Sequence, residues 1–376
     1  MINNLPGARR FLAEFWQKKP LLARGALAQF GGALDRARMI GLACRDDVES
    51  RLVIGSRKNW RVEHGPFRKR DFAQLPPRDW TLLINGLENV SAAARALQQK
   101  FSFIPYARHD DVMASYAVPG GSVGPHFDSY DVFLLQAAGA RRWQISSQRD
   151  LGLIEGAPLK ILRRFRSQRA WTAGPGDILY LPPRIAHYGV AVDECITWSI
   201  GFRAPNRQDM AERFLDFLRD NLRLDGAYRD PGLRLQRHPA AIGADMLRQV
   251  HGMVNSIRWT RADIERCLGE YLTEPRPQVV FRRARRVSAA RFAELAAARG
   301  IQLALNTRIL TCGTQFFING ESVRADAGAR DTLRALADRR CLPPRTRTNA
   351  AARALLYAWY RAGYIGLGDQ GNAEQV

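Results

Sequence analysis

The chain has 376 residues, 46% of them hydrophobic, and a formal net charge of +21 at pH 7. That length and apolar content predict two or three folded domains with substantial cores. No apolar run approaches the roughly 18 residues of a membrane-spanning helix, and residues 1–5 contain no basic segment that leads into an apolar one. We therefore expect a cytoplasmic protein. Five scattered cysteines, without a Cys-X-X-Cys pair, predict neither a disulfide framework nor a zinc site.

The positive charge favours a polyanionic neighbourhood such as ribosomal RNA, because basic side chains bind phosphate groups. Only 6 of the 57 basic residues are lysine, however. So strong an arginine bias also follows from codon composition alone, and the charge leaves both explanations open.

Residues 1–205 mix short strands with turn signals, which predicts a double-stranded β-helix with helices at its start. Within it, the sequence at 124–128 is predicted to be an extended strand, and alternation places His126 and Asp128 on the same side. The apolar sequence at 132–135 is typical of a buried barrel strand. An isolated His-X-Asp is more often a hydrogen-bonded surface pair, but in apolar surroundings the carboxylate needs a partner, and a metal ion is one.

A guanidinium is also predicted inside the barrel. After a turn at 137–140, alternation places Arg141 on the face of Trp143 and Ile145 and turns Arg142 outward. An arginine in an apolar interior needs an anion, which a dicarboxylate cosubstrate provides through a bidentate contact. The sequence leaves an internal aspartate or glutamate as an equal alternative.

The third candidate ligand is His187. It follows a predicted strand at 177–181 and two prolines, where a rigid turn would direct it back towards His126 and Asp128. Two histidines and one carboxylate form the facial ligand set of non-haem Fe(II) oxygenases, which leaves three coordination positions open.

Residues 206–274 are predicted to be helical. A second helix is expected at 241–257, after a first helix whose apolar residues recur at helical spacing: Ala211, Phe214, Leu215, Phe217 and Leu218. Two amphipathic helices beyond a complete barrel predict either core packing or a homodimer contact.

Pro275 and Pro277 mark a linker into the last region, residues 275–376, which is predicted to be a winged-helix-like module. Its expected elements are a helix at 288–299, a hairpin through Ile309 and Phe317 with Asn319 and Gly320 at or near its turn, and helices at 330–338 and 349–363. The whole chain is therefore α+β. Four arginines before the module form either a nucleic-acid contact or, more commonly, a solvated basic run: Arg282, Arg283, Arg285 and Arg286.

Several segments resemble the bacterial JmjC-type ribosomal oxygenases of the cupin class. They are WQKKP at 16–20, AVPGG at 117–121, GPHFDSYDVF at 124–133, GDILYLPP at 176–183 and SIGFRAP at 199–205. The likeness continues to a terminal helix at 355–364, so it covers nearly the whole chain. It implies a JmjC barrel, a helical dimerisation region that forms a homodimer, and a winged-helix-like domain. It also implies hydroxylation of an arginine of a large-subunit ribosomal protein, with 2-oxoglutarate as cosubstrate.

The resemblance gives the candidate ligands their roles. His126, Asp128 and His187 correspond to the ligands of a catalytic Fe(II), and Arg141 corresponds to the clamp on the distal carboxylate of 2-oxoglutarate. Oxygen would take the last open coordination position.

Two positions depart from the family pattern. Ala117 stands where relatives carry a hydroxyl residue, and Thr197 stands where they carry an amide. Ser115 and Ser199 are the remaining hydroxyl candidates for cosubstrate binding on the same strands.

Substrate contacts are predicted at Asp111, Met113 and Tyr130. Alternation places Asp111 and Met113 on one strand face, which the resemblance directs at the active site. Asp111 would pair with the substrate guanidinium, and Tyr130 would stack on its plane. In the family the hydroxylated carbon is the β-carbon. A turn cap at Asp111 and a core position for Tyr130 are the alternatives.

Other functions fit the same ligand set. A histidine hydroxylase of another ribosomal protein and a lysine demethylase both use it, and an acidic Asp111 favours a cationic target without separating lysine from arginine. A noncatalytic nucleic-acid-binding protein with a degenerate barrel is an alternative of a different class. Such a binder has no need of three intact metal ligands together with Arg141.

Overall fold

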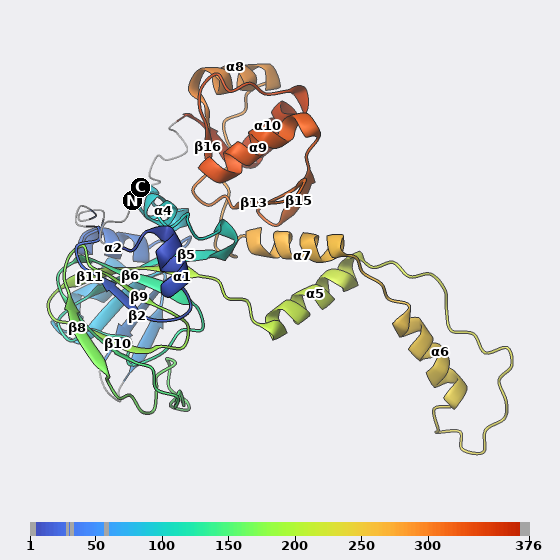
Figure 1. Cartoon of the computed structure of the whole chain (residues 1–376), viewed down its shortest axis with the longest axis horizontal. Coiled ribbons are helices and arrows are strands. Elements are labelled where there is room, and N and C mark those ends of the chain that lie inside the picture. The colour runs from blue at the N-terminus through green and yellow to red at the C-terminus, as the bar shows by residue number, and fades with distance from the viewer. Residues whose placement is uncertain (1–4, 28–29, 31–33, 56–59, 369–376) are drawn as a thin grey trace.

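The computed structural model describes residues 5–27, 30, 34–55 and 60–368. The expectation that residues 1–5 contain no leader concerns mostly residues 1–4, which lie outside these ranges. Figure 1 shows a strand-rich amino-terminal body, a group of helices that extends from it, and a smaller unit at the carboxy-terminal end. No helix in the described ranges is long and apolar enough to cross a membrane.

Two antiparallel sheets form the amino-terminal body. The larger has eight strands in the order β1-β9-β6-β11-β5-β4-β2-β3, and the smaller has three in the order β10-β7-β8. The larger sheet contains β1 (Leu21–Ala23), β2 (Ser50–Ile54), β3 (Arg61–His64), β4 (Trp80–Ile84), β5 (His109–Ala117), β6 (Asp131–Ala138), β9 (Ile178–Leu181) and β11 (Cys195–Phe202). The smaller sheet contains β7 (Arg141–Ser146), β8 (Arg169–Ala173) and β10 (Ala186–Ala191).

The space between these sheets is the barrel interior. One buried apolar cluster joins Val132 and Leu134 of β6 to Trp143 and Ile145 of β7, so the two sheets face each other. This arrangement is the double-stranded β-helix that the sequence predicts.

A second core lies on the other face of the large sheet. Phe133 of β6 is fully buried there, with its ring 4.6 Å from that of Phe101 and 5.3 Å from that of Phe11, measured between centroids. Because side chains alternate along a strand, β5 sends Val112 and Ala114 into this core. The alternate residues Asp111, Met113 and Ser115 face the barrel interior.

Short helices cover this second core. They are α1 (Ala8–Glu14), α2 (Arg36–Ala43), α3 (Lys69–Ala73) and α4 (Ala92–Gln99), with the 3-10 turns η1 (Leu87–Asn89) and η2 (Tyr106–Arg108). Side-chain caps begin two of them: Asp35 accepts a hydrogen bond from the backbone of α2, and Ser91 accepts one from the backbone of α4.

Three helices follow the barrel. They are α5 (Arg207–Asn221), α6 (Ala244–Asn255) and α7 (Arg261–Thr273), and no residue of α5 or α6 is buried. Figure 1 shows α6 projecting away from the rest of the chain. The first two agree with the predicted helices, whereas α7 has no separate counterpart in the prediction. It packs on the carboxy-terminal unit, where Gly269 lies against the ring of Phe317.

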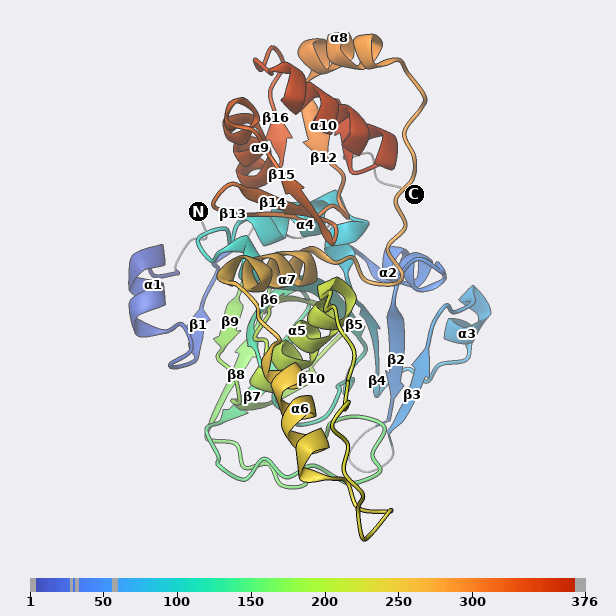
Figure 2. The same cartoon turned by 90° about the vertical axis from the view of Figure 1, so that its right-hand side faces the viewer.

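The carboxy-terminal unit combines three helices with two small sheets. Its elements are α8 (Ala289–Arg299), β12 (Ile301–Leu303), β13 (Ile309–Cys312), β14 (Gln315–Ile318), β15 (Glu321–Arg324), α9 (Ala327–Arg339), β16 (Cys341–Leu342), α10 (Ala350–Ala362) and β17 (Ile365–Leu367). Figure 2 shows this unit stacked over α7 and α4.

The hairpin differs in detail from the predicted one. The strands that contain Ile309 and Phe317 are joined through Gly313, and Asn319 and Gly320 form the next turn, between β14 and β15. Their φ angles of +49° and +87° suit a two-residue hairpin turn, for which Asn-Gly is a preferred sequence.

Candidate metal centre and substrate cavity

His126 and His187 face each other across a single antiparallel bridge. His126 N donates to His187 O at 2.9 Å, and His187 N donates to His126 O at 2.7 Å. His187 lies in β10, but His126 lies outside the strands, so the predicted regular strand at 124–128 is wrong in this respect. Pairing cannot continue there because Pro125 has no N–H and Gly124 turns the chain with a φ of +80°.

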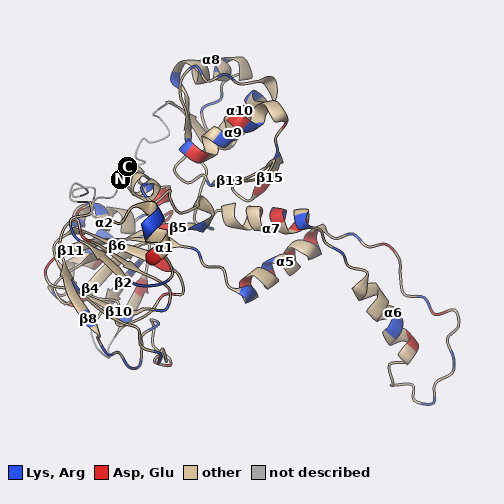
Figure 3. Ribbon diagram, in the orientation of Figure 1, with Lys and Arg blue, Asp and Glu red and all other residues tan. Residues whose placement is uncertain are grey.

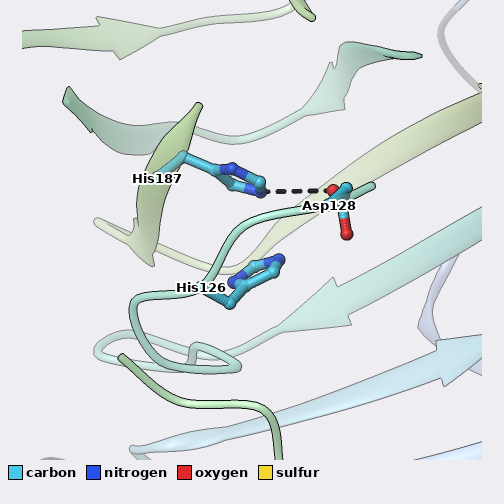
Figure 4. A group of neighbouring side chains, drawn as sticks. All are labelled: His126, Asp128 and His187. Carbon is cyan, nitrogen blue, oxygen red and sulfur yellow. Dashed lines mark ion pairs between the residues drawn. The ribbon is translucent and has the colours of Figure 1, made fainter. Parts of the chain in front are cut away.

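Asp128 lies beside the two imidazoles. Its carbonyl oxygen accepts a hydrogen bond from Arg184 N at 2.7 Å, and its Oδ2 lies 3.6 Å from His187 Nε2. The rings of His126 and His187 have centroids 4.2 Å apart. Figure 4 shows the three side chains gathered around one point. One donor atom from each lies within 4.8 Å of the other two, so all three can contact one ion.

Hydrogen bonds fix which imidazole nitrogen is free. Nδ1 of His126 contacts Gly124 O at 2.9 Å, and Nδ1 of His187 contacts Ile185 O at 2.9 Å. Each Nδ1–H therefore donates to a carbonyl and leaves Nε2 with its lone pair. Burial and the neighbouring His126 lower the pKa of His187 to about 4, so this imidazole is neutral. Two imidazoles and a carboxylate fit a divalent transition metal.

Arg141 is buried in β7 beside Trp143, as alternation predicts, while Arg142 is exposed. Its Nη2 lies 3.7 Å from Cys195 Sγ, and its Nε has no hydrogen-bond partner. Within the described ranges it forms no ion pair, so the alternative of an internal aspartate or glutamate is not realised there. Cys195 belongs to a cluster of small buried residues with Ala117 and Ala191, and Ala191 is the strand partner of Arg141. A buried guanidinium with unused donors fits an anionic ligand.

Polar residues continue along the interior face of β5 and β11. The register pairs Ser115 with Thr197 and Met113 with Ser199. Ser115 Oγ donates to Thr197 O at 3.4 Å, and Thr197 Oγ1 donates to Gln136 Oε1 at 2.9 Å. The Thr197 hydroxyl is thus held by Gln136, whereas Ser199 lines a cavity.

That cavity has a volume of about 280 Å³ and contains the three predicted substrate contacts, Asp111, Met113 and Tyr130. Asp111 lies within β5, so it does not cap a turn, and burial raises the pKa of its carboxyl to about 6. Tyr130 is 36% exposed and is therefore not a core residue. Burial and the nearby Asp128 raise the pKa of its phenol, which stays protonated at neutral pH.

A larger groove of about 620 Å³ opens beside the cavity and shares Tyr130 and Asp110 with it. Arg213 of α5 and Tyr271 of α7 also line this groove.

Sequence reasoning missed three charged residues around the cavity. Arg276 lies 3.4 Å from both Asp110 and Asp111, and the fully buried Glu88 accepts from Val112 N at 2.8 Å. Arg308 Nη2 lies 3.5 Å from Glu88 Oε1. The Pro-Arg-Pro sequence at 275–277 was the only local signal for any of them.

The barrel and its ligand set are those of a JmjC-type oxygenase. The JmjC domain model matches residues 96–210, and the ROXA-like winged-helix model matches residues 256–366.

Relatives and solved structures identify the family within this class. The chain is 31% identical to the ribosomal protein uL16 3-hydroxylase of Escherichia coli over 87% of each chain. It is 42% identical to a probable ribosomal oxygenase of Haemophilus influenzae over 60% of this chain, which spans about half (54%) of that relative. A ribosomal oxygenase from Escherichia coli, solved in complex with cobalt and 2-oxoglutarate, superposes with a TM-score of 0.81 at 28% identity and covers 96% of this chain and 98% of its own. The chain belongs to the JmjC ribosomal oxygenase family.

Replacement of one imidazole should abolish tight metal binding. We expect His126→Ala to weaken cobalt binding by at least about a hundredfold, because only two of the three ligands remain. Titration followed by the visible absorbance of bound Co(II) measures this. The exposed His238→Ala serves as the matched control and should bind cobalt like the wild type. Equal affinities for all three proteins would show that the ion binds elsewhere.

Proposed function

We propose that this chain is an Fe(II)- and 2-oxoglutarate-dependent oxygenase that hydroxylates the β-carbon of an arginine in a large-subunit ribosomal protein. One observation carries the proposal: a His-Asp-His ligand set lies in the same barrel as a buried arginine that has no carboxylate partner among the described residues. The relatives named ribosomal oxygenase and uL16 3-hydroxylase support the reaction and the substrate class.

His126, Asp128 and His187 would hold the iron. When bound together, Fe(II), 2-oxoglutarate and oxygen insert one oxygen atom into a substrate carbon–hydrogen bond and the other into succinate, with release of carbon dioxide. The barrel contributes fixed ligands and an interior lined largely by apolar side chains, which excludes water from the reacting atoms.

Arg141 would bind the distal carboxylate of 2-oxoglutarate, with Ser115 and Ser199 as polar contacts along the same interior face. The side chain of Cys195, which lies against the guanidinium and packs with Ala117, is small. Thr197 would act indirectly, because its hydroxyl is bound to Gln136.

Asp111 would bind the guanidinium of the substrate arginine, and Tyr130 would pack against its plane. Met113 supplies apolar contact for the side-chain methylenes in the same cavity. A carboxylate at one wall of the cavity selects a cation, and the planar ring opposite suits a planar guanidinium better than an ammonium.

The quaternary structure belongs to the same proposal. Five apolar residues form one face of α6 and are exposed, with Leu247 56% and Val254 59% accessible: Met246, Leu247, Val250, Met253 and Val254. An apolar face of this kind favours a homodimer.

We also propose domain boundaries at 1–205, 206–274 and 275–376, a cytoplasmic location, and contact with ribosomal RNA. Lys and Arg positions are distributed along the ribbon in Figure 3, and many of them are exposed, which supports the contact with RNA.

Incubation of unmodified large-subunit ribosomal proteins with the enzyme, Fe(II), 2-oxoglutarate and oxygen should add the mass of one oxygen atom to one protein. Intact mass spectrometry measures the gain, and fragmentation should place it on an arginine. His126→Ala should give no gain. Oxygen on a histidine, or removal of a methyl group from a lysine, would reject the arginine assignment.

Arg141→Gln should raise the KM for 2-oxoglutarate by about tenfold to a hundredfold, because a charge-assisted bidentate contact contributes roughly 1.5–3 kcal/mol. Initial rates of 2-oxoglutarate consumption at several concentrations give this KM. Arg142→Gln, on the exposed face of the same strand, is the control. An unchanged KM in the Arg141 variant would place the cosubstrate elsewhere.

Leu247→Glu should convert the homodimer to a monomer, because a carboxylate would be buried in an apolar contact. Light scattering after size exclusion gives the mass directly. Gln249→Glu on the same helix should stay dimeric. A wild-type protein that is already monomeric would reject the dimer.

A further inference from the structure

The carboxylate of Asp111 already has a cationic partner within the chain. Arg276 lies in the linker after α7, with Nη1 3.4 Å from Asp111 Oδ2 and Nη2 3.4 Å from Asp110 Oδ1. This residue takes no part in the metal centre. Its position at the carboxylate assigned to substrate recognition requires an explanation.

The two oxygens of Asp111 have different surroundings. Oδ2 faces Arg276. Oδ1 lies above Gly201, where a Cβ atom would be 3.2 Å from this oxygen and 3.7 Å from Cε2 of Tyr130. Since glycine has no side chain, the space between Oδ1 and the Tyr130 ring stays open. A planar cation entering the cavity would meet the free oxygen on one side and the ring on the other.

Arg276 is held in place by its own segment. Pro275 and Pro277 flank it, and proline fixes its own φ and restricts the residue before it to extended conformations. Its carbonyl oxygen accepts a hydrogen bond from Val279 N at 2.9 Å. The preceding helix is anchored where Gly320 N donates to Thr273 Oγ1 at 3.0 Å. A segment so constrained suits a fixed support rather than a plug that swings out for substrate.

Charged and titratable groups reach the surroundings of Asp111 from every neighbouring element. They are Asp110 on β5, Glu88 on η1, Glu49 and Arg51 at β2, Tyr130 before β6, Arg203 after β11, Arg308 before β13, and Arg276 on the linker. Burial raises the pKa of Asp111, and Arg276 is the strongest influence that lowers it. Removal of Arg276 would leave a crowded group of carboxylates that favours protonation of Asp111.

We propose that Arg276 is a positioning residue for substrate recognition: it orients Asp111 through Oδ2 and balances its charge, so that Oδ1 is presented to a cationic substrate side chain opposite Tyr130. This inference rests on the proposed function. Under it, the Asp111 carboxylate contacts two guanidinium groups: that of the substrate arginine and that of Arg276.

The test compares Arg276→Gln and Arg276→Lys with the wild type, using unmodified uL16 as substrate. We expect Arg276→Gln to raise the KM for uL16 by at least about tenfold near neutral pH, with the smaller change in kcat, because ground-state recognition is lost. Arg276→Lys keeps the charge and should recover part of the affinity. Arg261→Gln removes an exposed arginine from α7 and should match the wild type.

The pH dependence separates charge balance from a merely structural role. Ionised Asp111 binds the cation, so affinity is present above its pKa of about 6 and falls as the pH drops through that value. Without Arg276 the pKa is higher, and the loss begins at higher pH. The KM defect of Arg276→Gln should therefore shrink between about pH 6.5 and about pH 8.5. A defect that is equal at both values would overturn the inference.

Gly201→Ala tests the other oxygen without touching Arg276. The added methyl group would enter the space between Oδ1 and Tyr130, and we expect the KM for uL16 to rise by at least about tenfold. An unchanged KM would mean that the substrate does not use Oδ1. This variant keeps the inference testable should Arg276→Gln fail to fold.

The remaining outcomes are distinct. A lower KM in Arg276→Gln would show that Arg276 competes with substrate, and an unchanged KM would show no role. Loss of 2-oxoglutarate turnover in the absence of uL16 would move the effect to the metal centre. Each of these rejects the inference while the proposed function stands. Failure of the wild type to hydroxylate an arginine of any large-subunit ribosomal protein, uL16 included, rejects the proposed function, and the inference falls with it.

Discussion

The two backbone hydrogen bonds between His126 and His187 are the constraint on which the rest of the site depends. They join a loop without regular strand structure to β10 and set the two imidazoles side by side. Asp128 follows two residues later and is fixed by the amide of Arg184. Cosubstrate and substrate must meet at one ion. The role of every other polar group in the barrel therefore depends on where it lies relative to these two histidines.

The interior face of β5 sets the distance between the two ends of the site. Ala117 pairs with Cys195, which contacts Arg141, and Asp111 lies six residues away at the acidic end. At about 3.3 Å per residue, the strand separates these ends by roughly 20 Å. Ser115 and Met113 occupy the positions between them. Under the proposed function, this strand would hold the site for the anionic cosubstrate apart from the site for the cationic substrate side chain.

Local patterns predicted the parts of the site that depend on one segment. His-X-Asp placed His126 and Asp128 on one side, and alternation alone turned Arg141 inward. Arg276 was not predicted, because it meets Asp111 from 165 residues along the chain and no periodicity encodes that contact. The irregular backbone at His126 was not predicted for a similar reason. Alternation describes the direction of side chains, whereas backbone pairing depends on the neighbouring strand.

The buried Glu88 has a consequence for chain synthesis. It accepts a hydrogen bond from Val112 N in β5 and lies 3.5 Å from Arg308, which is far towards the carboxy terminus. All the metal ligands, and the last barrel strand, emerge from the ribosome long before Arg276 and Arg308. A growing chain can therefore form the barrel that carries the three ligands before Asp111 and Glu88 gain their cationic partners, Arg276 and Arg308.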